Sequence, residues 1–144
     1  MPFVKEGVAM FSTRIKNYSS FEYEVIDIKK NKFKDPKGIK KWEAEALLHL
    51  LSPSDHVILL DENGKSFTSR KFSDWLQQKM NLSYKSVVFI VGGAFGFDES
   101  LKQRADALLS ISDMTFSHQL IRVIFLEQLY RAFTILKNEK YHND

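Results

Sequence analysis

The sequence predicts an α/β fold, a mainly parallel sheet with helices on both faces. Stretches with apolar residues at helical spacing alternate with short, wholly apolar runs, as expected of helices packed around buried parallel strands. The chain has 144 residues, of which 44% are apolar, and this length suffices for one self-sufficient core. We therefore expect a single domain over residues 1–144.

The N-terminal third is expected to hold two helices with a strand between them. Apolar residues recur every three or four positions over residues 3–17, which predicts the first helix. Alternating apolar and acidic residues over 21–28 predict a strand. Pro36 is tolerated in a first helical turn, so a second helix is predicted from Asp35 to Leu51. Its expected buried residues are Ile39, Trp42, Ala46, Leu47 and Leu50.

A strand and a helix follow in the middle of the chain. Residues 56–60 form an apolar run without alternation, which predicts a strand covered on both faces. The polar residues 61–64 predict a turn after it. Thr68 or Ser69 can then cap a helix that extends to Met80.

The C-terminal half repeats the pattern. Residues 86–91 predict a second fully apolar strand, and Asp98 is a suitable cap for a helix through about Leu108. Residues 109–112 predict one more short strand, and Ser117 can cap the longest helix, over 118–137.

The longest predicted helix also bears on assembly. We expect Phe125 and Leu126 to lie off its main apolar stripe, which would leave surface for a second copy of the chain. The positions expected to be buried are Leu120, Ile121, Ile124, Leu129, Ala132, Phe133 and Leu136.

Several classes of protein are excluded by composition. Without cysteine there is no disulfide, no thiolate nucleophile and no cysteine-ligated metal, and no metal-binding histidine spacing is present. The most apolar stretch, 120–136, contains three charged residues and is too polar for a membrane span. From these observations we expect a protein that binds neither membrane nor metal. Because the N-terminus lacks the pattern of a signal peptide, we expect it to be cytoplasmic.

Lysine is concentrated around the start of the second predicted helix, although the net charge of +3 is modest. Between residues 29 and 41 lie seven lysines and one acidic residue, Asp35. The lysines are Lys29, Lys30, Lys32, Lys34, Lys37, Lys40 and Lys41. Such a cluster attracts phosphates, but it is also typical of a solvated loop that binds nothing.

A ligand site is expected where the parallel strands end, because open α/β sheets bind ligands beyond the carboxyl ends of their strands. The candidate segments are 60–64, 92–97 and 111–116. The glycines of 92–97 have the spacing G-G-x-x-G, which differs from the dinucleotide fingerprint, and no Walker lysine follows. They are compatible with a tight turn or with a cofactor loop.

Polar residues near the C-terminus are a second group of candidates. Glu127 and Arg131 lie four apart on one helix face, a spacing that is more typical of an ordinary ion pair than of a catalytic pair. His118, at a helix start, has the position of a surface residue, and Tyr141-His142 lie where chains often fray.

Three stretches carry a resemblance to a known family. They are V-G-G-A-F-G-F at 91–97, L-S-I-S-D-M-T-F-S-H at 109–118 and E-Q-L-Y-R-A at 127–132, followed by Tyr141-His142. Together they closely resemble the ribosomal RNA large-subunit methyltransferase H family, whose members are SPOUT methyltransferases. A looser likeness reaches back to the N-terminus.

This resemblance implies a SPOUT-type α/β domain with a C-terminal trefoil knot, acting as a homodimer. It implies methyl transfer from S-adenosylmethionine to N3 of a pseudouridine in the 23S rRNA of the assembled ribosome. A non-catalytic ribosome-binding module of the same fold is the alternative. Family members have a strand upstream of the residue that aligns with Met1, so we expect the first strand to be missing.

The resemblance also implies the site residues. Those expected to hold the cofactor are Leu60, Gly92, Gly93, Ile111, Ser112, Asp113, Met114, Thr115 and Phe116. Those expected to act in catalysis are Glu127, Arg131, Tyr141, His142 and His118, and by residue type Glu127, His118 and His142 are candidate general bases. The resemblance favours a composite site in which one protomer holds the cofactor and its partner supplies Tyr141 and His142, with Glu127 or Arg131 as further candidates from the partner.

Overall fold

The computed structural model describes residues 1–27, 32–82, 84 and 86–143. Its internal contacts divide the chain into two compact units. The sheet unit consists of Glu24–Lys65 and Tyr84–Ser110. The helical unit consists of Met1–Tyr23, Ser66–Ser83 and Ile111–Asp144. A single domain over the whole chain stays a prediction.

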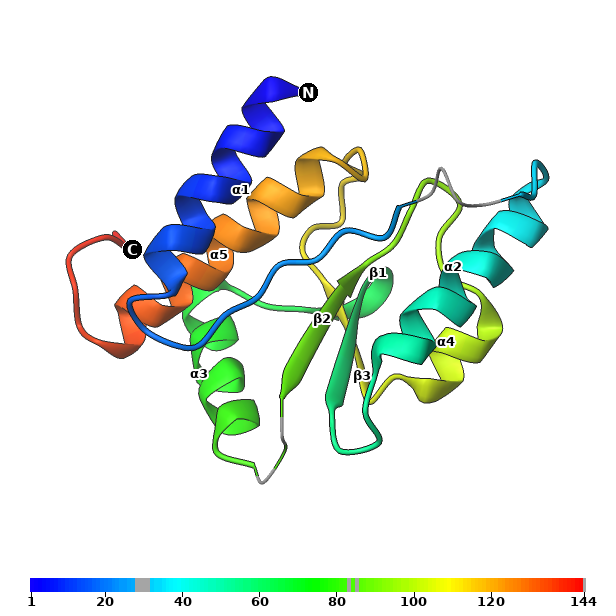
Figure 1. Ribbon diagram of the computed structural model, residues 1–144. Coiled ribbons are helices and arrows are strands. Elements are labelled where there is room, and N and C mark those ends of the chain that lie inside the picture. The colour runs from blue at the N-terminus through cyan, green and yellow to red at the C-terminus, as the bar shows by residue number, and fades with distance from the viewer. Residues whose placement is uncertain (28–31, 83, 85, 144) are drawn as a thin grey trace. The chain divides into compact units, whose positions relative to one another are not determined.

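The sheet unit is built on three strands, β1 (His56–Ser66), β2 (Val87–Val91) and β3 (Ala107–Ser110). They lie in the order β2-β1-β3 in a parallel sheet (Figure 1). β1 and β2 pair from His56 opposite Val87 to Leu60 opposite Val91. The consecutive residues Val57 and Ile58 point to opposite faces of the sheet and have no exposed surface, so β1 is covered on both faces, as predicted.

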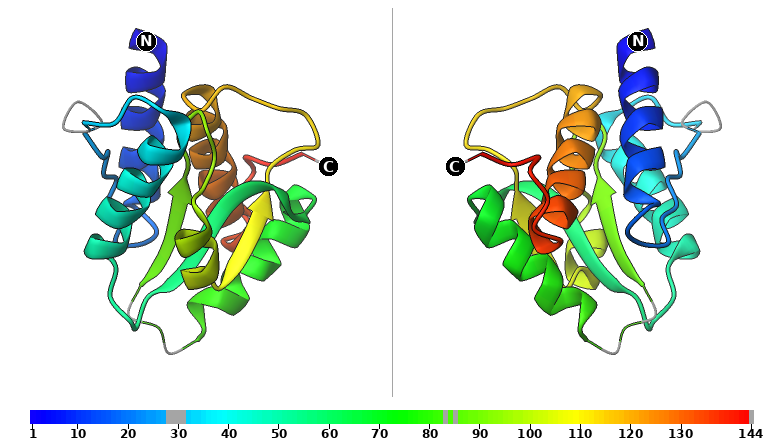
Figure 2. Two further views of the ribbon diagram at one scale, coloured as in Figure 1. Left: turned by 90° about the vertical axis from the view of Figure 1, so that its right-hand side faces the viewer. Right: turned by 90° about the vertical axis from the view of Figure 1, so that its left-hand side faces the viewer.

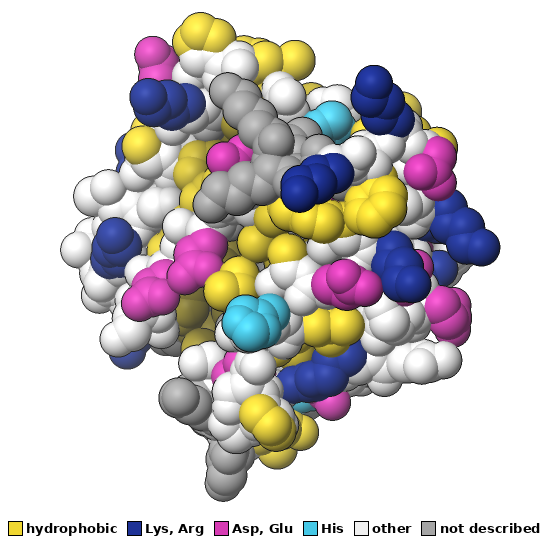
Figure 3. All heavy atoms as spheres, turned by 45° about the vertical axis from the view of Figure 1, so that its right-hand side comes forward, with side chains coloured by type: hydrophobic (Ala, Val, Ile, Leu, Met, Phe, Trp, Pro, Cys, Tyr) yellow, Lys and Arg dark blue, Asp and Glu magenta, His cyan; other side chains and the backbone are white. Residues whose placement is uncertain are grey.

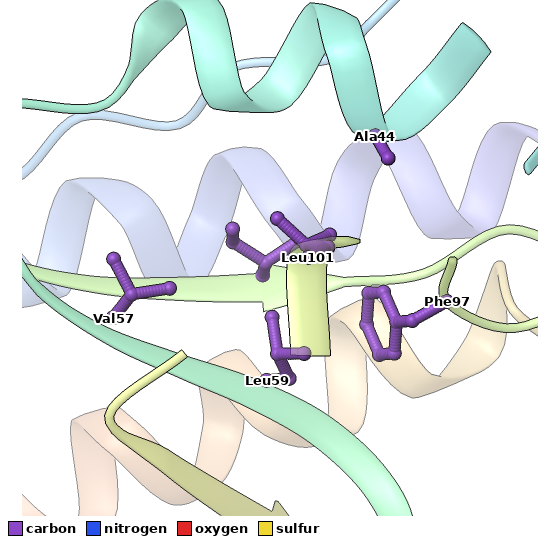
Figure 4. Packing of buried hydrophobic residues seen from close by; sticks show 6 residues of the cluster. Ala44, Val57, Leu59, Phe97 and Leu101 are labelled. Atoms are coloured by element: carbon purple, nitrogen blue, oxygen red, sulfur yellow. The ribbon is translucent and has the colours of Figure 1, made fainter. Parts of the chain in front are cut away.

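Two helices, α2 (Pro36–Leu50) and α4 (Glu99–Arg104), provide the core of this unit. The Asp35 carboxylate caps α2 by accepting a hydrogen bond from the Gly38 N–H at 3.0 Å. Ala44 of α2 and Leu101 of α4 point toward the sheet (Figure 4). The buried cluster consists of Ala44, Val57, Leu59, Ile90, Phe97 and Leu101.

The helical unit contains α1 (Pro2–Ile15), α3 (Ser69–Met80) and α5 (Leu120–Leu136). α5 packs against both other helices, and Figure 2 shows α1 and α5 side by side. Gly7 makes the close approach to α5 possible, because a Cβ atom there would lie 2.9 Å from Val123 Cγ1. The predicted helices at 3–17, 68–80 and 118–137 are thus confirmed with small shifts of their ends.

The turn predicted at 61–64 is wrong, because β1 continues through these residues to Ser66. Pairing with β3 outweighs the turn preference of the Asp-Glu-Asn-Gly sequence. At Gly64 the two backbones are so close that a Cβ atom would lie 2.6 Å from the carbonyl carbon of Leu108. Glycine therefore permits contact between strands here and does not reverse the chain.

The strand predicted at 21–28 is also wrong for its described part. Residues 21–27 have no regular secondary structure, and the side chain of Val25 is 61% exposed. A strand needs a neighbour to satisfy its backbone groups, and the described strands pair only in the order β2-β1-β3. Residue 28 lies outside the described part of the chain.

The helix predicted through Leu108 ends at Arg104, and β3 begins two residues earlier than expected. Asp106 explains both shifts. Its N–H donates to the Val57 carbonyl at 2.7 Å, and its carboxylate accepts from the Val57 N–H at 2.8 Å. Asp106 thereby binds the chain to the edge of β1 before a further helical turn can form.

The burial predicted for two helices needs correction. Phe125 and Leu126 of α5 are buried, because α1 and α3 cover the helix from two sides and the Phe72 ring meets Phe125 edge-on. Surface left by these two residues therefore does not support a second copy of the chain. On α2 the buried face is centred on Ala44, while Leu50 is 56% exposed.

The fold class is confirmed as an α/β structure with a parallel sheet flanked by helices. The trefoil knot that the resemblance implies stays a prediction. Within the described ranges, no helix is long and apolar enough to cross a membrane.

Candidate functional site

The first candidate region, the sheet edge, consists of Leu60, Gly92 and Gly93 in the sheet unit. Leu60 is paired with Val91, the last residue of β2, and the two glycines follow directly. Since β1 continues to Ser66, Leu60 lies within its strand and marks the level at which β2 ends. Parallel register thus brings the three residues to one end of β2, where open α/β sheets bind ligands.

A tight turn follows this edge. The Gly96 N–H donates to the Gly93 carbonyl at 3.2 Å, and the two residues form an isolated bridge. Gly96 has a φ of 80°, which side chains rarely permit. The G-G-x-x-G spacing is therefore that of a tight turn, and the turn places two glycines at the end of β2.

Side chains pack closely over both glycines. A Cβ atom at Gly93 would lie 2.9 Å from Oε1 of Glu43, and one at Gly92 would lie 3.1 Å from the Phe97 ring. Glu43 projects from α2, so a carboxylate stands directly beside the sheet edge. No motif in the sequence pointed to Glu43, because its position depends on how α2 packs on the strands.

The segment 111–116 continues the chain from the end of β3 at Ser110. Within it, the Ser112 hydroxyl accepts a hydrogen bond from the Met114 N–H at 3.0 Å, which forms a local turn. The Met114 side chain is 74% exposed. The cofactor contacts expected of these six residues stay predictions.

The second candidate region, the tail cluster, consists of Glu127, Arg131, Tyr141 and His142 in the helical unit. Arg131 Nε donates to Glu127 Oε1 at 3.0 Å, and Nη2 donates to the same oxygen. The Tyr141 hydroxyl also donates to Glu127 Oε1, at 3.0 Å. Arg131 Nη1 lies 3.0 Å from His142 Nδ1, so four of the five predicted catalytic residues lie together.

The contact with Arg131 determines which nitrogen of His142 carries the proton. A guanidinium group can only donate, so Nδ1 accepts the hydrogen bond. The neutral imidazole must then carry its proton on Nε2. His142 therefore presents an N–H donor on its other side, and its Nδ1 lone pair is engaged.

Tyr141 is held in its protonated form. Burial, followed by the hydrogen bond to Glu127, raises the pKa of its hydroxyl. The Arg131 guanidinium lies 4.7 Å from the centre of the Tyr141 ring, and the Tyr130 ring meets the same ring edge-on at 4.8 Å. These contacts with the ring and with the hydroxyl fix a residue that a terminal position alone would leave frayed.

A further chain of hydrogen bonds supports Glu127 from the opposite side. Gln128 Nε2 donates to Glu127 Oε2 at 3.0 Å, and the Ser69 hydroxyl donates to Gln128 Oε1 at 2.8 Å. Both carboxylate oxygens are thus occupied by donors, which makes Glu127 the organiser of the cluster. Ser69, Gln128 and Tyr130 were not predicted, because their roles depend on contacts between helices.

His118 lies apart from the tail cluster. It precedes the first turn of α5, where the Ser117 hydroxyl accepts from the Leu120 N–H at 3.1 Å. From Leu120 to Glu127 the helix rises by roughly 10 Å. In the described part of the chain, no three acidic or histidine side chains are placed to hold a metal ion.

Comparisons with known proteins show which family the chain belongs to. A family model described as "Predicted SPOUT methyltransferase" matches residues 1–142. The "Ribosomal RNA large subunit methyltransferase H" of Christiangramia forsetii is 50% identical over 137 residues, which are 94% of this chain and 87% of the relative. The protein of the same name from Parabacteroides distasonis is 48% identical over 140 residues, 96% of this chain and 89% of the relative.

A third relative of that name, from Pseudothermotoga lettingae, is 49% identical over 143 residues, which are 98% of this chain and 89% of the relative. The family match spans both units, including the sheet edge and the tail cluster. The chain therefore belongs to the SPOUT methyltransferase family.

Proposed function

We propose that this protein transfers a methyl group from S-adenosylmethionine to N3 of a pseudouridine in the large-subunit (23S) rRNA of the assembled ribosome. The observation that carries the proposal is the tail cluster, in which a terminal tyrosine and histidine are fixed on Glu127 and Arg131. The names of the relatives support rRNA as the substrate. Action on ribosomes also leads us to expect a cytoplasmic protein.

The sheet edge fits the cofactor by its shape and by its charge. Its two glycines have no side chain where Glu43 and the Phe97 ring approach the backbone, and the Glu43 carboxylate beside Gly93 is complementary to a cation. S-adenosylmethionine carries a sulfonium cation and no polyphosphate, which agrees with the lack of a Walker lysine. When bound, it supplies an electrophilic methyl group. We propose that Leu60, Gly92, Gly93 and the segment 111–116 hold it.

The tail cluster would orient the target base. Arg131 supplies a fixed positive charge, Tyr141 a neutral hydroxyl, and His142 an N–H on Nε2. Holding the reacting atoms at about 3–3.5 Å supplies much of the rate in such a transfer. Of the candidate bases, Glu127 has both oxygens occupied and His142 has Nδ1 engaged, so we assign both to orientation.

We propose that the active form is a homodimer in which the tail of one protomer completes the site at the partner's sheet edge. This proposal rests on the resemblance. It is tested by mixing a subunit that lacks residues 141–144 with one that carries Gly93→Val. A tail acting between subunits restores one working site, whereas an inactive but assembled mixed dimer contradicts the composite site.

The lysine cluster would contact rRNA phosphates. Lys37, Lys40 and Lys41 lie on α2 and Lys32 and Lys34 precede it, while Lys29 and Lys30 lie outside the described residues. Figure 3 shows Lys and Arg side chains interspersed with Asp and Glu side chains on one face of the molecule. The hydrogen bonds with Ser100 are the main cause that lowers the pKa of Asp98, and the positive charges of Lys40 and Lys41 lower it further.

Two measurements test the proposed function. Calorimetric titration with S-adenosylmethionine should show binding that depends on Gly93, and ribosomes lacking the modification should accept labelled methyl groups from the purified protein. Binding to ribosomes without transfer would instead indicate a non-catalytic module of the same fold.

A further inference from the structure

The C-terminal tail, residues 139–143, is turned back toward α5 by a defined helix end. Asn138 follows the helix with a φ of 54°, and its N–H donates to the Ile135 carbonyl at 3.1 Å. The Glu139 N–H donates to the Thr134 carbonyl at 2.9 Å. This pair of bonds with a left-handed residue between helix and tail is the Schellman motif, which reverses the chain.

At the point of reversal the tail meets the end of α1. The Tyr18 hydroxyl donates to Glu139 Oε2 at 2.7 Å, although the residues are 121 positions apart in the sequence. The Tyr18 ring is itself well held. It stacks on Phe133 at 5.7 Å with an angle of 10° between the planes, and its backbone N–H donates to the Ile15 carbonyl.

Tyr141 and His142 follow two and three positions after this contact. Tyr141 and His142 bind Glu127 and Arg131, so the tail is attached at Glu139 and again at its end. The Tyr130 ring links the two attachments, lying 6.1 Å from the Tyr18 ring and 4.8 Å from the Tyr141 ring. A segment this short, held at both ends, retains little conformational freedom.

Resting on the proposed function, we propose that the hydrogen bond between Tyr18 and Glu139 positions the tail so that Tyr141 and His142 reach the geometry needed for methyl transfer. Tyr18 and Glu139 are positioning residues, because they act through the tail. The hydrogen bond to Glu139 raises the pKa of Tyr18 to about 12, so the hydroxyl remains a donor throughout the neutral range.

Tyr18→Phe tests the proposal most cleanly, because it removes the hydroxyl and keeps the ring that stacks on Phe133. The expected result is a fall in kcat of about three- to tenfold, the value of one hydrogen bond. The KM for ribosomes and the Kd for S-adenosylmethionine should stay the same, since the lysine cluster and the sheet edge are untouched. Glu139→Gln should act in the same direction, and the double variant should be no worse than Tyr18→Phe alone.

Tyr23→Phe is the matched control, because Tyr23 is an exposed tyrosine that follows α1 in the chain. It should leave kcat unchanged. A rise in the KM for ribosomes or a loss of cofactor affinity as large as the loss of kcat would overturn the positioning role. Additive effects of Tyr18→Phe and Glu139→Gln would overturn it as well.

A second readout does not depend on the substrate. Carboxypeptidase should release the C-terminal residues faster from Tyr18→Phe than from the wild-type protein or from Tyr23→Phe. Equal release rates would contradict the proposal that the hydrogen bond between Tyr18 and Glu139 holds the tail, even if ribosomes are methylated. If release is faster from Tyr18→Phe but the wild-type protein methylates no ribosome, the hydrogen bond between Tyr18 and Glu139 still holds the tail, and the proposed substrate is contradicted.

Discussion

The sheet edge and the tail cluster are built in opposite ways. The sheet edge presents backbone, and its geometry depends on atoms that are absent at Gly92 and Gly93. The tail cluster consists of charged and polar side chains that converge on one carboxylate, Glu127. The first region should therefore be sensitive to added atoms and the second to removed hydrogen bonds. The sheet edge thus suits a cofactor that must be enclosed, and the tail cluster suits an RNA base that must be oriented.

The largest effect is expected from the carboxylate that organises the tail cluster. Glu127→Gln keeps the shape of the side chain but removes the charge that binds Arg131 and Tyr141. We expect kcat for ribosome methylation to fall on the order of 100-fold, because the groups that orient the substrate lose their position, with cofactor affinity unchanged. Labelled methyl transfer and calorimetry measure the two quantities.

Glu22→Gln is a matched control, because Glu22 is exposed in the segment between α1 and α2. It should have no effect on kcat. Equal losses of cofactor affinity and kcat in Glu127→Gln would contradict the separation of the two regions.

The next largest effect is expected at the sheet edge. Gly93→Val adds a branched side chain that displaces Glu43 and intrudes where the ligand must approach. The affinity for S-adenosylmethionine should fall at least about tenfold, which corresponds to roughly 1.4 kcal/mol. The affinity of Gly93→Ala for S-adenosylmethionine should lie between that of the wild type and that of Gly93→Val. Ala94→Val is the control, since Ala94 is exposed in the same turn, and it should bind normally.

The helices and the buried strands were predictable because their signals are local. The i,i+4 spacing of Glu127 and Arg131 likewise predicted a shared helix face, and the structure shows the pair bonded. The alternation of apolar and acidic residues over 21–27 predicted a strand wrongly, because a strand requires a pairing partner that a local pattern cannot reveal. The turn predicted at 61–64 failed for the converse reason, since β3 provides such a partner.

The arrangement of the tail cluster was not predictable from local pattern. Asn138 is a suitable residue for the left-handed position after a helix, and it was the one available sign that the tail turns back. That Tyr141 then meets Glu127, and Glu139 meets Tyr18, depends on packing between segments far apart in the sequence. The position of Glu43 beside Gly93 depends on packing in the same way.

A smaller effect, confined to ribosome binding, is expected from the lysine cluster. Replacing Lys32 and Lys34 by glutamine should raise the KM for ribosomes and reduce the slope of log affinity against log salt by about 0.7–0.9 for each lost phosphate contact. Cofactor affinity should not change. Lys102→Gln on α4 is a control for net charge and should leave the slope unchanged. An unchanged slope in the double variant would mean that Lys32 and Lys34 are solvated and contact no phosphate.

The smallest effect is an alkaline change in stability. The pKa of Tyr18 is raised from 10.0 to about 12, so its contribution to stability is complete below pH 10 and is lost as the pH rises from 10 to 12. The free energy of unfolding of Tyr18→Phe should therefore approach that of the wild type across this range. Urea titrations at both ends of the range measure it, and a constant difference between the proteins would contradict the shift.

The most direct test of the account is mass spectrometry of large-subunit rRNA from cells that lack this protein, before and after treatment of their ribosomes with the purified chain and S-adenosylmethionine. We predict that one pseudouridine lacks a methyl group, that the wild-type chain restores it, and that the chain without residues 141–144 does not although it binds the cofactor. Unchanged rRNA in the deletion strain, or full restoration by the shortened chain, would contradict the account.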